Sequence, residues 1–175
     1  MRRRLLAIAL VVVAGAALYY FVFRGSTVAP RVLVPTPTAI IGSGSAAVAV
    51  GANGAIIPWF PLPEDAELPR LPISEPPKSG RLAGPLLEQA RVLGATPAAL
   101  RRYVVGSYYG ESGVDVNLTS GIELRFGDAS QAALKWKSAA AVLADPTITA
   151  LDYVDLHSPR HPATGGSGHS LPPAP

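Results

Sequence analysis

The sequence predicts an α+β protein in which a single N-terminal transmembrane helix precedes a mostly antiparallel sheet with helices packed on one face. Three observations indicate this class. Residues 5–23 carry no charge, residues 113–128 alternate between apolar and polar, and residues 85–93 and 128–144 show helical spacing. Strands that are interrupted by helices and joined by hairpin turns are typical of α+β domains.

The composition excludes several kinds of chemistry. The 175 residues include no cysteine, which excludes disulfides, thiolate metal sites, cysteine nucleophiles and lipid-anchored cysteines. Of the 15 basic residues, Arg2, Arg3, Arg4 and Arg24 flank the N-terminal apolar stretch, and the other 11 stand against 12 acidic residues. A nearly neutral body without a basic stripe argues against nucleic-acid binding.

The N-terminal apolar stretch has the length of a membrane span. As a helix, residues 5–23 would cover roughly 30 Å at about 1.5 Å per residue. Three arginines precede the stretch and one follows it, which predicts a single-pass inner-membrane protein with a cytoplasmic N-terminus and an extracytoplasmic C-terminal domain. A cleaved secretory signal is the alternative, but cleavage at residues 14–17 would leave the apolar run LYYFVF at the new N-terminus.

The chain divides into four parts by composition. Residues 1–24 are predicted to form a cytoplasmic stub and the transmembrane helix, and the proline-rich residues 25–38 a linker with an edge strand at 31–34. The folded extracytoplasmic domain is predicted at residues 39–157. The remainder, residues 158–175, is rich in proline, glycine and serine and is predicted to be a disordered tail.

Turn signals define the first strands of the domain. Residues 39–41 and 46–50 are strand-like and are separated by Gly42-Ser43-Gly44-Ser45. Asn53-Gly54 then predicts a hairpin to residues 55–57, because both residues accept positive φ. Residues 58–77 hold seven prolines, too many for a helix or a central strand, so an extended segment that crosses the sheet and buries Trp59 is expected.

Two short helices and a long one follow. Pro85 can begin a helix that Gly94 ends, and Thr96 can cap a second helix over residues 98–105. Asp128 is predicted to cap the long helix through Ala144. In this helix Gln131 completes the capping pattern, and the core-facing stripe is Ala133, Trp136, Ala140 and Leu143.

The alternating stretch at residues 113–128 predicts a hairpin with a defined register. A loop at Thr119-Ser120-Gly121 places Val116 opposite Leu124 and Asp115 opposite Arg125 on the wet face. A slip by one residue would expose every apolar side chain of the hairpin, so the register is well specified. The same register pairs Leu118 with Ile122 and Val114 with Phe126.

The residues carry no recognisable active site. The glycine–serine segment 42–45 lacks the lysine and helix start of a nucleotide-binding loop. Residues 165–169 set a serine beside a histidine, but the predicted tail gives a nucleophile no rigid mount. His157 and His161 have metal-ligand spacing, yet Pro159 between them prevents a helix that presents both. The sequence therefore predicts a protein that is not an enzyme and holds no metal or cofactor.

The C-terminal half resembles the FtsQ/DivIB family of cell-division proteins. The motifs are GIELRFGD, KWKSAAAVLADP and LDYVDLHSPRHPAT, in which Gly127, Lys135 and Asp155 match the family's turn, helix and strand. Upstream, VLVPTPTAII, GANGAIIPW and ELPRLPI resemble earlier family elements in the same order. The family normally has a POTRA module between the membrane span and this domain, but only residues 24–31 separate Phe23 from VLVPTPTAII. The resemblance therefore implies either a shortened or divergent member without most or all of this module, or a sequence from which the segment has been lost.

The resemblance implies a bitopic scaffold of the division complex. Its expected partners are the membrane and FtsB/DivIC-like and FtsL-like proteins, and its role is to support septal wall synthesis. In the family the last strands expose an edge that pairs with a partner segment, and free backbone amides on a rigid strand can accept such a strand. The candidate partner-binding residues, on a strand predicted at residues 147–156, are Leu151, Tyr153, Val154, Asp155 and Leu156.

Three alternatives stay open. The strand at residues 147–156 could be an ordinary edge strand protected by Asp152 and Asp155. The chain could be a secreted, signal-processed envelope domain that binds a small ligand or wall polymer. It could also be an envelope hydrolase built on His157 or His169.

Overall fold

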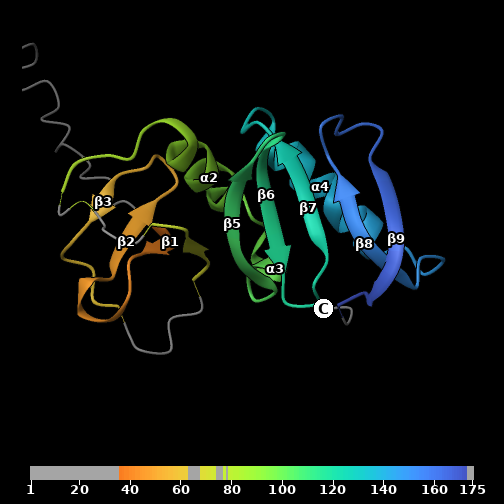
Figure 1. The fold of residues 1–175 in the computed structure, drawn as a ribbon, viewed down its shortest axis with the longest axis horizontal. Coiled ribbons are helices and arrows are strands. Elements are labelled where there is room, and N and C mark those ends of the chain that lie inside the picture. Colours follow the sequence, from red (N-terminus) through yellow and green to blue (C-terminus); the bar gives the residue numbers. More distant parts are fainter. Residues whose placement is uncertain (1–35, 63–67, 74–76, 78, 173–175) are drawn as a thin grey trace, which may run out of the picture. The chain divides into compact units, whose positions relative to one another are not determined.

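Nine strands form one sheet in the part of the chain that the structure describes (Figure 1). The structure is a computed structural model and describes residues 36–62, 68–73, 77 and 79–172. The sheet order is β3-β2-β1-β4-β5-β6-β7-β8-β9, and all pairs are antiparallel except β1–β4, β4–β5 and β7–β8, which confirms the mostly antiparallel sheet. The strands are β1 (Pro37–Ile41), β2 (Val48–Gly51), β3 (Ile56–Ile57), β4 (Arg70–Leu71), β5 (Val104–Gly110), β6 (Gly113–Leu118), β7 (Glu123–Gly127), β8 (Ala150–Asp155) and β9 (Ala163–Ser170).

The predicted membrane span at residues 5–23 and the predicted strand at residues 31–34 lie outside the described residues. Within the described residues, no helix is long and apolar enough to cross a membrane.

The Asn53-Gly54 hairpin is confirmed between β2 and β3. Gly54 takes a φ of +76°, and the Asn53 side chain accepts a 2.9 Å hydrogen bond from the amide of Ala55. The predicted strand at residues 46–50 begins only at Val48, because the preceding residues form the short 3-10 helix η1 (Gly44–Ala46).

The proline-rich segment departs from the prediction in two ways. Arg70 and Leu71 form the short strand β4 in the middle of the sheet, between β1 and β5. Pro69 and Pro72 flank these two residues, so proline is kept out of the strand itself. Trp59 was expected in the core, but 70% of its surface is exposed.

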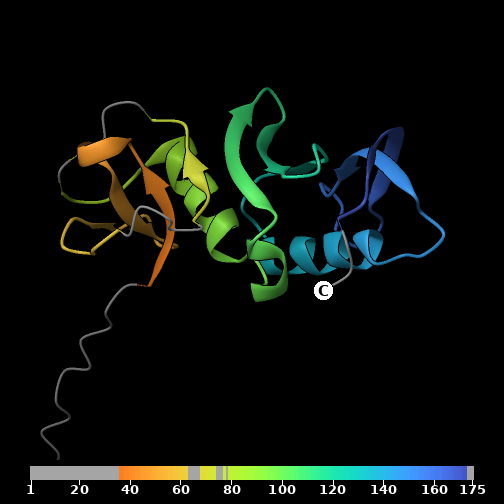
Figure 2. The ribbon, with the colours of Figure 1, turned by 90° about the horizontal axis from the view of Figure 1, so that it is seen from below.

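Helices α2 (Gly84–Gly94) and α4 (Ala132–Leu143) pack on the same face of the sheet (Figures 1 and 2). The prediction of helices on one face is confirmed. The indole Nε1 of Trp136 in α4 donates a 2.8 Å hydrogen bond to the carbonyl of Val92 in α2, and the ring centroids of Trp136 and Phe126 are 5.0 Å apart. The predicted core position of Trp136 is therefore confirmed.

The helix α3 (Ala98–Arg101) is shorter than predicted. Its N-cap is Pro97, and the hydroxyl of Thr96 makes no capping hydrogen bond. The helix ends early because Val104, which was assigned to it, already begins β5.

The helix α4 begins later than predicted, and Asp128 does not cap it. The Asp128 carboxylate instead accepts hydrogen bonds from Ser130 and Lys135, and Gln131 occupies the N-cap with a φ of +52°. The buried face of α4 also differs from the predicted core-facing stripe. Ala133 of that stripe is exposed and Ala140 is half-buried, and the residues just before them, Ala132 and Ala139, are buried instead. The buried residues of α4 are Ala132, Lys135, Trp136, Ala139 and Leu143.

The β6–β7 hairpin has the predicted register over most of its length. Val116 lies opposite Leu124 and Asp115 opposite Arg125, but a bulge places Val114 opposite Gly127. The six apolar side chains predicted to share the inner face are all buried. Asp115, predicted on the wet face, is only 7% exposed.

The C-terminal residues differ most from the prediction. Residues 163–170, expected in a disordered tail, form β9 and pair antiparallel with β8. The folded domain therefore continues past residue 157, and β8 is an inner strand between β7 and β9 (Figure 1).

Candidate functional site

The residues predicted to bind a partner lie on β8 and just after it. The expectation that they form the terminal edge is wrong, because β9 covers that side of β8. Leu151, Val154 and Leu156 are at most 4% exposed and belong to the core. Tyr153 and Asp155 are half-buried and share the face with Glu123 and Arg125 of β7, so their contact with a partner stays a prediction.

Tyr153 fastens β9 to the rest of the sheet. Its ring lies across Gly165 of β9, where an added Cβ would come within 2.5 Å of the phenol oxygen. On the other side, the Arg125 guanidinium carbon lies 4.0 Å from the centroid of the same ring. Such a cation–π contact contributes about 0.5–1 kcal/mol at an exposed site.

A polar network covers the face of β5, β6 and β7 opposite the helices. Tyr108 donates a 2.5 Å hydrogen bond to Glu123, and Arg125 donates another of 2.5 Å to the second oxygen of the same carboxylate. The hydrogen bond to Glu123 raises the pKa of Tyr108 to about 12. Burial alone would raise the pKa of Glu123, but the bonds from Tyr108 and Arg125 outweigh it and lower that pKa. Burial, with the nearby Glu123 charge, raises the pKa of Asp115.

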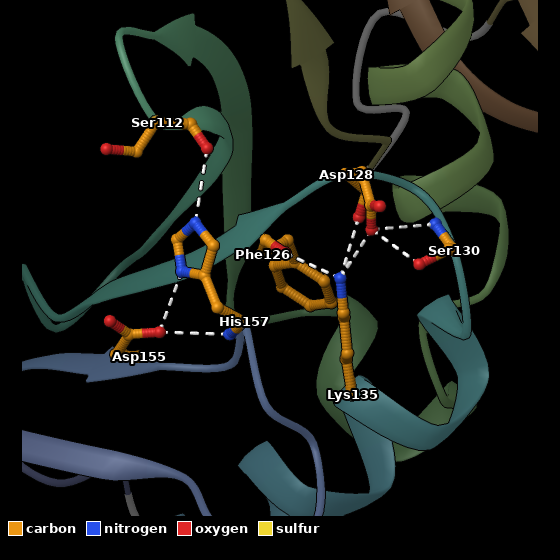
Figure 3. Close-up of polar contacts among 7 residues, drawn as sticks. All are labelled: Ser112, Phe126, Asp128, Ser130, Lys135, Asp155 and His157. Atoms are coloured by element: carbon orange, nitrogen blue, oxygen red, sulfur yellow. Dashed lines mark hydrogen bonds and ion pairs between the residues drawn. The ribbon is translucent and has the colours of Figure 1, made fainter.

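A histidine joins the end of β8 to the β5–β6 turn (Figure 3). The Nδ1 of His157 lies 2.8 Å from Asp155 Oδ1, and its Nε2 lies 3.2 Å from the backbone carbonyl oxygen of Ser112. The hydrogen bond to Asp155 is the largest cause of a raised pKa for His157. Because an added Cβ on Gly127 would come within 2.6 Å of the imidazole, glycine is needed there.

A buried lysine fixes the loop between β7 and α4 (Figure 3). The Lys135 side chain is 3% exposed, and its ammonium donates to the carbonyls of Phe126 (2.7 Å) and Asp128 (3.0 Å) and to the Asp128 carboxylate (2.7 Å). Three acceptors match the three donors of an ammonium. The hydrogen bond from Lys135 lowers the pKa of Asp128 to about 2. The arrangement is that of a structural clamp, and each of its three donors is used within the fold.

A bulge in β9 holds the carboxylate of Asp152. Leu151 pairs with His169 and Tyr153 with Gly165, so residues 166–168 form an extra loop on β9. The Asp152 carboxylate accepts a 2.8 Å hydrogen bond from the amide of Gly168 and lies 3.1 Å from His169 Nδ1.

The histidines do not form an evident catalytic arrangement. His157 and His169 each face a carboxylate, and neither makes a hydrogen bond to a serine or threonine hydroxyl in the described part of the chain. A serine nucleophile needs its base within hydrogen-bond reach. No group of three or more histidine, aspartate or glutamate side chains is placed to hold a metal ion among the described residues.

The two ends of the sheet are different. At β3 the outer side is covered, since the Ile56 amide donates to Gly80 at 3.0 Å and the Leu82 amide to Gly54 at 2.8 Å. At β9 no further strand pairs with the outer side within the described residues, and every residue of β9 is at least partly exposed. Among the described residues, the free edge of the sheet is therefore β9, in the segment that the sequence predicts to be a disordered tail.

The orientation of the β9 backbone follows from its neighbours. The Leu156 amide donates a 2.8 Å hydrogen bond to the carbonyl of Arg125 in β7. Because backbone amides alternate in direction along a strand, the Val154 amide, two residues earlier, also points to β7. The Tyr153 and Asp155 amides then point to β9. Since Thr164 lies opposite Val154, its amide and carbonyl point outward, away from β8.

Comparison with known proteins adds no family to these findings. No protein-family model matches the chain, and no curated protein shows significant similarity to it.

Proposed function

We propose that the protein is a bitopic membrane scaffold of the bacterial cell-division complex, which binds a partner by adding the partner's strand to β9. The observation that carries the proposal is the free edge of β9, eight residues long, at the end of a nine-stranded sheet. Strand addition needs unpaired amides and carbonyls on a strand that is itself held in place.

The remainder of the domain supplies that rigidity. Tyr153 packs on Gly165, Asp152 holds the bulge, and His157 and Lys135 fasten the ends of β8 and β7. The motif resemblance to FtsQ/DivIB proteins supports the choice of FtsB/DivIC-like and FtsL-like partners and of septal wall synthesis as the process served.

β9 also lacks the lysine and proline residues that often protect an edge strand from pairing. It contains no lysine and no proline, and three of its residues are glycines. The bulge at residues 166–168 interrupts the strand, so we expect a partner to pair along the regular segment around Thr164.

A matched pair of substitutions at Thr164 tests the proposal in the full-length chain. Thr164→Pro removes the outward amide and leaves the β8–β9 hydrogen bonds, which Ala163 and Gly165 make, in place. Thr164→Val keeps the amide and nearly the same shape. We expect Thr164→Pro to abolish co-purification with the division partners and Thr164→Val to retain it, with both variants unfolding at similar temperatures. Equal capture by both variants would remove the β9 edge from the proposal.

A second candidate is a secreted envelope domain that binds a small polar ligand or wall polymer. An open depression of about 420 Å³ lies beside β9. Its lining includes Tyr103, Thr119, Ser120 and His169, and the Ser120 hydroxyl is buried without a hydrogen-bond partner among the described atoms. Mass spectrometry of the mature N-terminus separates the two candidates, since a start near Leu18 supports secretion and a start at Met1 or Arg2 supports the anchor.

A further inference from the structure

An apolar loop follows β3 and carries Trp59, the most exposed of the large apolar side chains in the described part of the chain. The loop, residues 58–62, contains no ionisable group. Pro58 and Pro61 are exposed like Trp59, and Phe60 and Leu62 are half-buried. A run of this kind on the surface indicates a contact with an apolar environment outside the domain.

The backbone of the loop suits a medium of low polarity. Pro58 and Pro61 have no amide hydrogen, and the Phe60 amide is satisfied by the Ile57 carbonyl at 3.2 Å. Few backbone donors would therefore lose water on transfer. Tryptophan adds a large apolar ring with one polar N–H, the combination that favours the boundary between lipid headgroups and acyl chains.

The loop is also within reach of a membrane that holds the N-terminal part of the chain. β3 is two strands from β1, a distance of about 10 Å at the usual strand spacing. Ala49 pairs with both Ile40 and Ile57, so the loop follows β3 at the level of the C-terminal end of β1, about 10 Å along the strand direction from Pro37, where the chain leaves the domain. Residues 24–35 can span at most roughly 40 Å when extended, so an anchored domain stays within reach of the membrane surface.

We infer that the loop at residues 58–62 contacts the lipid surface of the membrane that anchors the chain, with Trp59 at the headgroup–acyl boundary. The inference rests on the proposed membrane anchor. Glu64, Asp65 and Glu67 follow in the sequence, so the contact is apolar and does not depend on anionic lipid.

Tryptophan fluorescence of the full-length chain in vesicles tests the contact. The chain has two tryptophans, and Trp136 is fully buried, so the difference between wild type and Trp59→Phe reports Trp59 alone. The vesicles are phosphatidylcholine with and without phosphatidylglycerol, and with acyl chains brominated near the headgroup. Carbonate extraction of the same vesicles shows whether the chain is anchored.

We expect the Trp59 component to be blue-shifted, to lose most of its quenching by acrylamide and to be quenched by the brominated lipid. The added phosphatidylglycerol should change none of these, and Trp59→Phe should show no bromine quenching. An anchored chain whose Trp59 is quenched by acrylamide but not by bromine would overturn the inference and leave the anchor intact. Shielding from acrylamide without bromine quenching would mean a protein contact and would also overturn it. Release of the chain by carbonate would overturn both the anchor and the inference.

Discussion

Each ring nitrogen of His157 faces a hydrogen-bond acceptor, and the acceptor of Nδ1 is Asp155 Oδ1 at 2.8 Å. The second acceptor, the carbonyl of Ser112, belongs to the turn between β5 and β6. A neutral imidazole has one N–H and can satisfy only one acceptor, whereas the imidazolium satisfies both. The contact between the end of β8 and the β5–β6 turn is therefore strongest when His157 is protonated.

This contact should make stability depend on pH. Because the folded protein raises the pKa of His157 above 6.5, the contribution is fully present below pH 6.5 and is lost as the pH rises through the raised pKa. Hydrogen bonds from His157, working against burial, lower the pKa of Asp155 below 3.8, so its contribution is present above pH 3.8 and is lost as the pH falls through the lowered value.

We therefore expect His157→Asn to cost most between about pH 4 and pH 6.5, by up to about 1 kcal/mol for an exposed pair. Once the pH is well above the raised pKa of His157, the wild type and the variant should converge. Urea unfolding at a series of pH values measures the difference. If the loss of unfolding free energy in His157→Asn does not depend on pH, protonation of His157 does not strengthen the contact.

Lys135 is expected to be the most sensitive charged residue of the domain. Lys135→Met removes the donor to two backbone carbonyls and to Asp128, which leaves buried acceptors unsatisfied. The expected loss in the free energy of unfolding is about 3 kcal/mol, the magnitude for removing one partner of a buried charged group.

Asp128→Asn is the matched control for Lys135. The Asp128 side chain is 64% exposed, so losing its charge should cost about 1 kcal/mol or less, and the two carbonyl contacts of Lys135 remain. If the two variants lose equal free energy of unfolding, the salt bridge to Asp128 and not the two carbonyl contacts accounts for the stabilisation by Lys135.

Local patterns predicted the β6–β7 hairpin, whereas they failed at β9. The hairpin has period-2 alternation and a glycine-containing loop, and both signals lie within a few residues of each other. β9 buries no large apolar side chain. It is held by backbone pairing with β8 and by Tyr153 and Asp152 packed against its glycines, and these are contacts between segments that composition does not reveal. Its glycine and serine content is typical of a flexible chain, so the sequence predicts the free edge at β8 and not at β9.

The prediction that the proline-rich segment contains no central strand failed for a related reason. Proline excludes a residue from a central strand, yet β4 needs only Arg70 and Leu71, which stand between Pro69 and Pro72. Likewise, Asp155 and His157 are neighbours in sequence, but Ser112 reaches them only through the folded sheet. Sequence could therefore suggest the pair and not the acceptor that completes it.

Tyr108 should titrate above the ordinary pKa of a tyrosine, which is about 10. Its hydrogen bond to Glu123 raises its pKa to about 12, so one phenol should ionise near pH 12 in an ultraviolet titration, and Tyr108→Phe should remove that step. Losing a hydrogen bond to a charged acceptor should also cost roughly 1.5 kcal/mol. Tyr109→Phe is the control, because Tyr109 is 46% exposed and should change stability little. If the step near pH 12 persists in Tyr108→Phe, the assignment is wrong.

Gly113 is expected to be the glycine least able to accept a side chain. Its φ is +110°, and an added Cβ would lie 2.1 Å from the carbonyl oxygen of Gly127 across the β6–β7 bulge, where neither backbone can give way. Gly80 has a similar φ of +98° but no atom within 4 Å of an added Cβ. Gly80→Ala should thus show the cost of the left-handed backbone alone, about 1 kcal/mol. Gly113→Ala adds the clash and should cost about 3 kcal/mol or more, or prevent folding. Circular dichroism melts of the two variants compare them directly, and similar losses would show that the hairpin can open at the bulge to admit a methyl group.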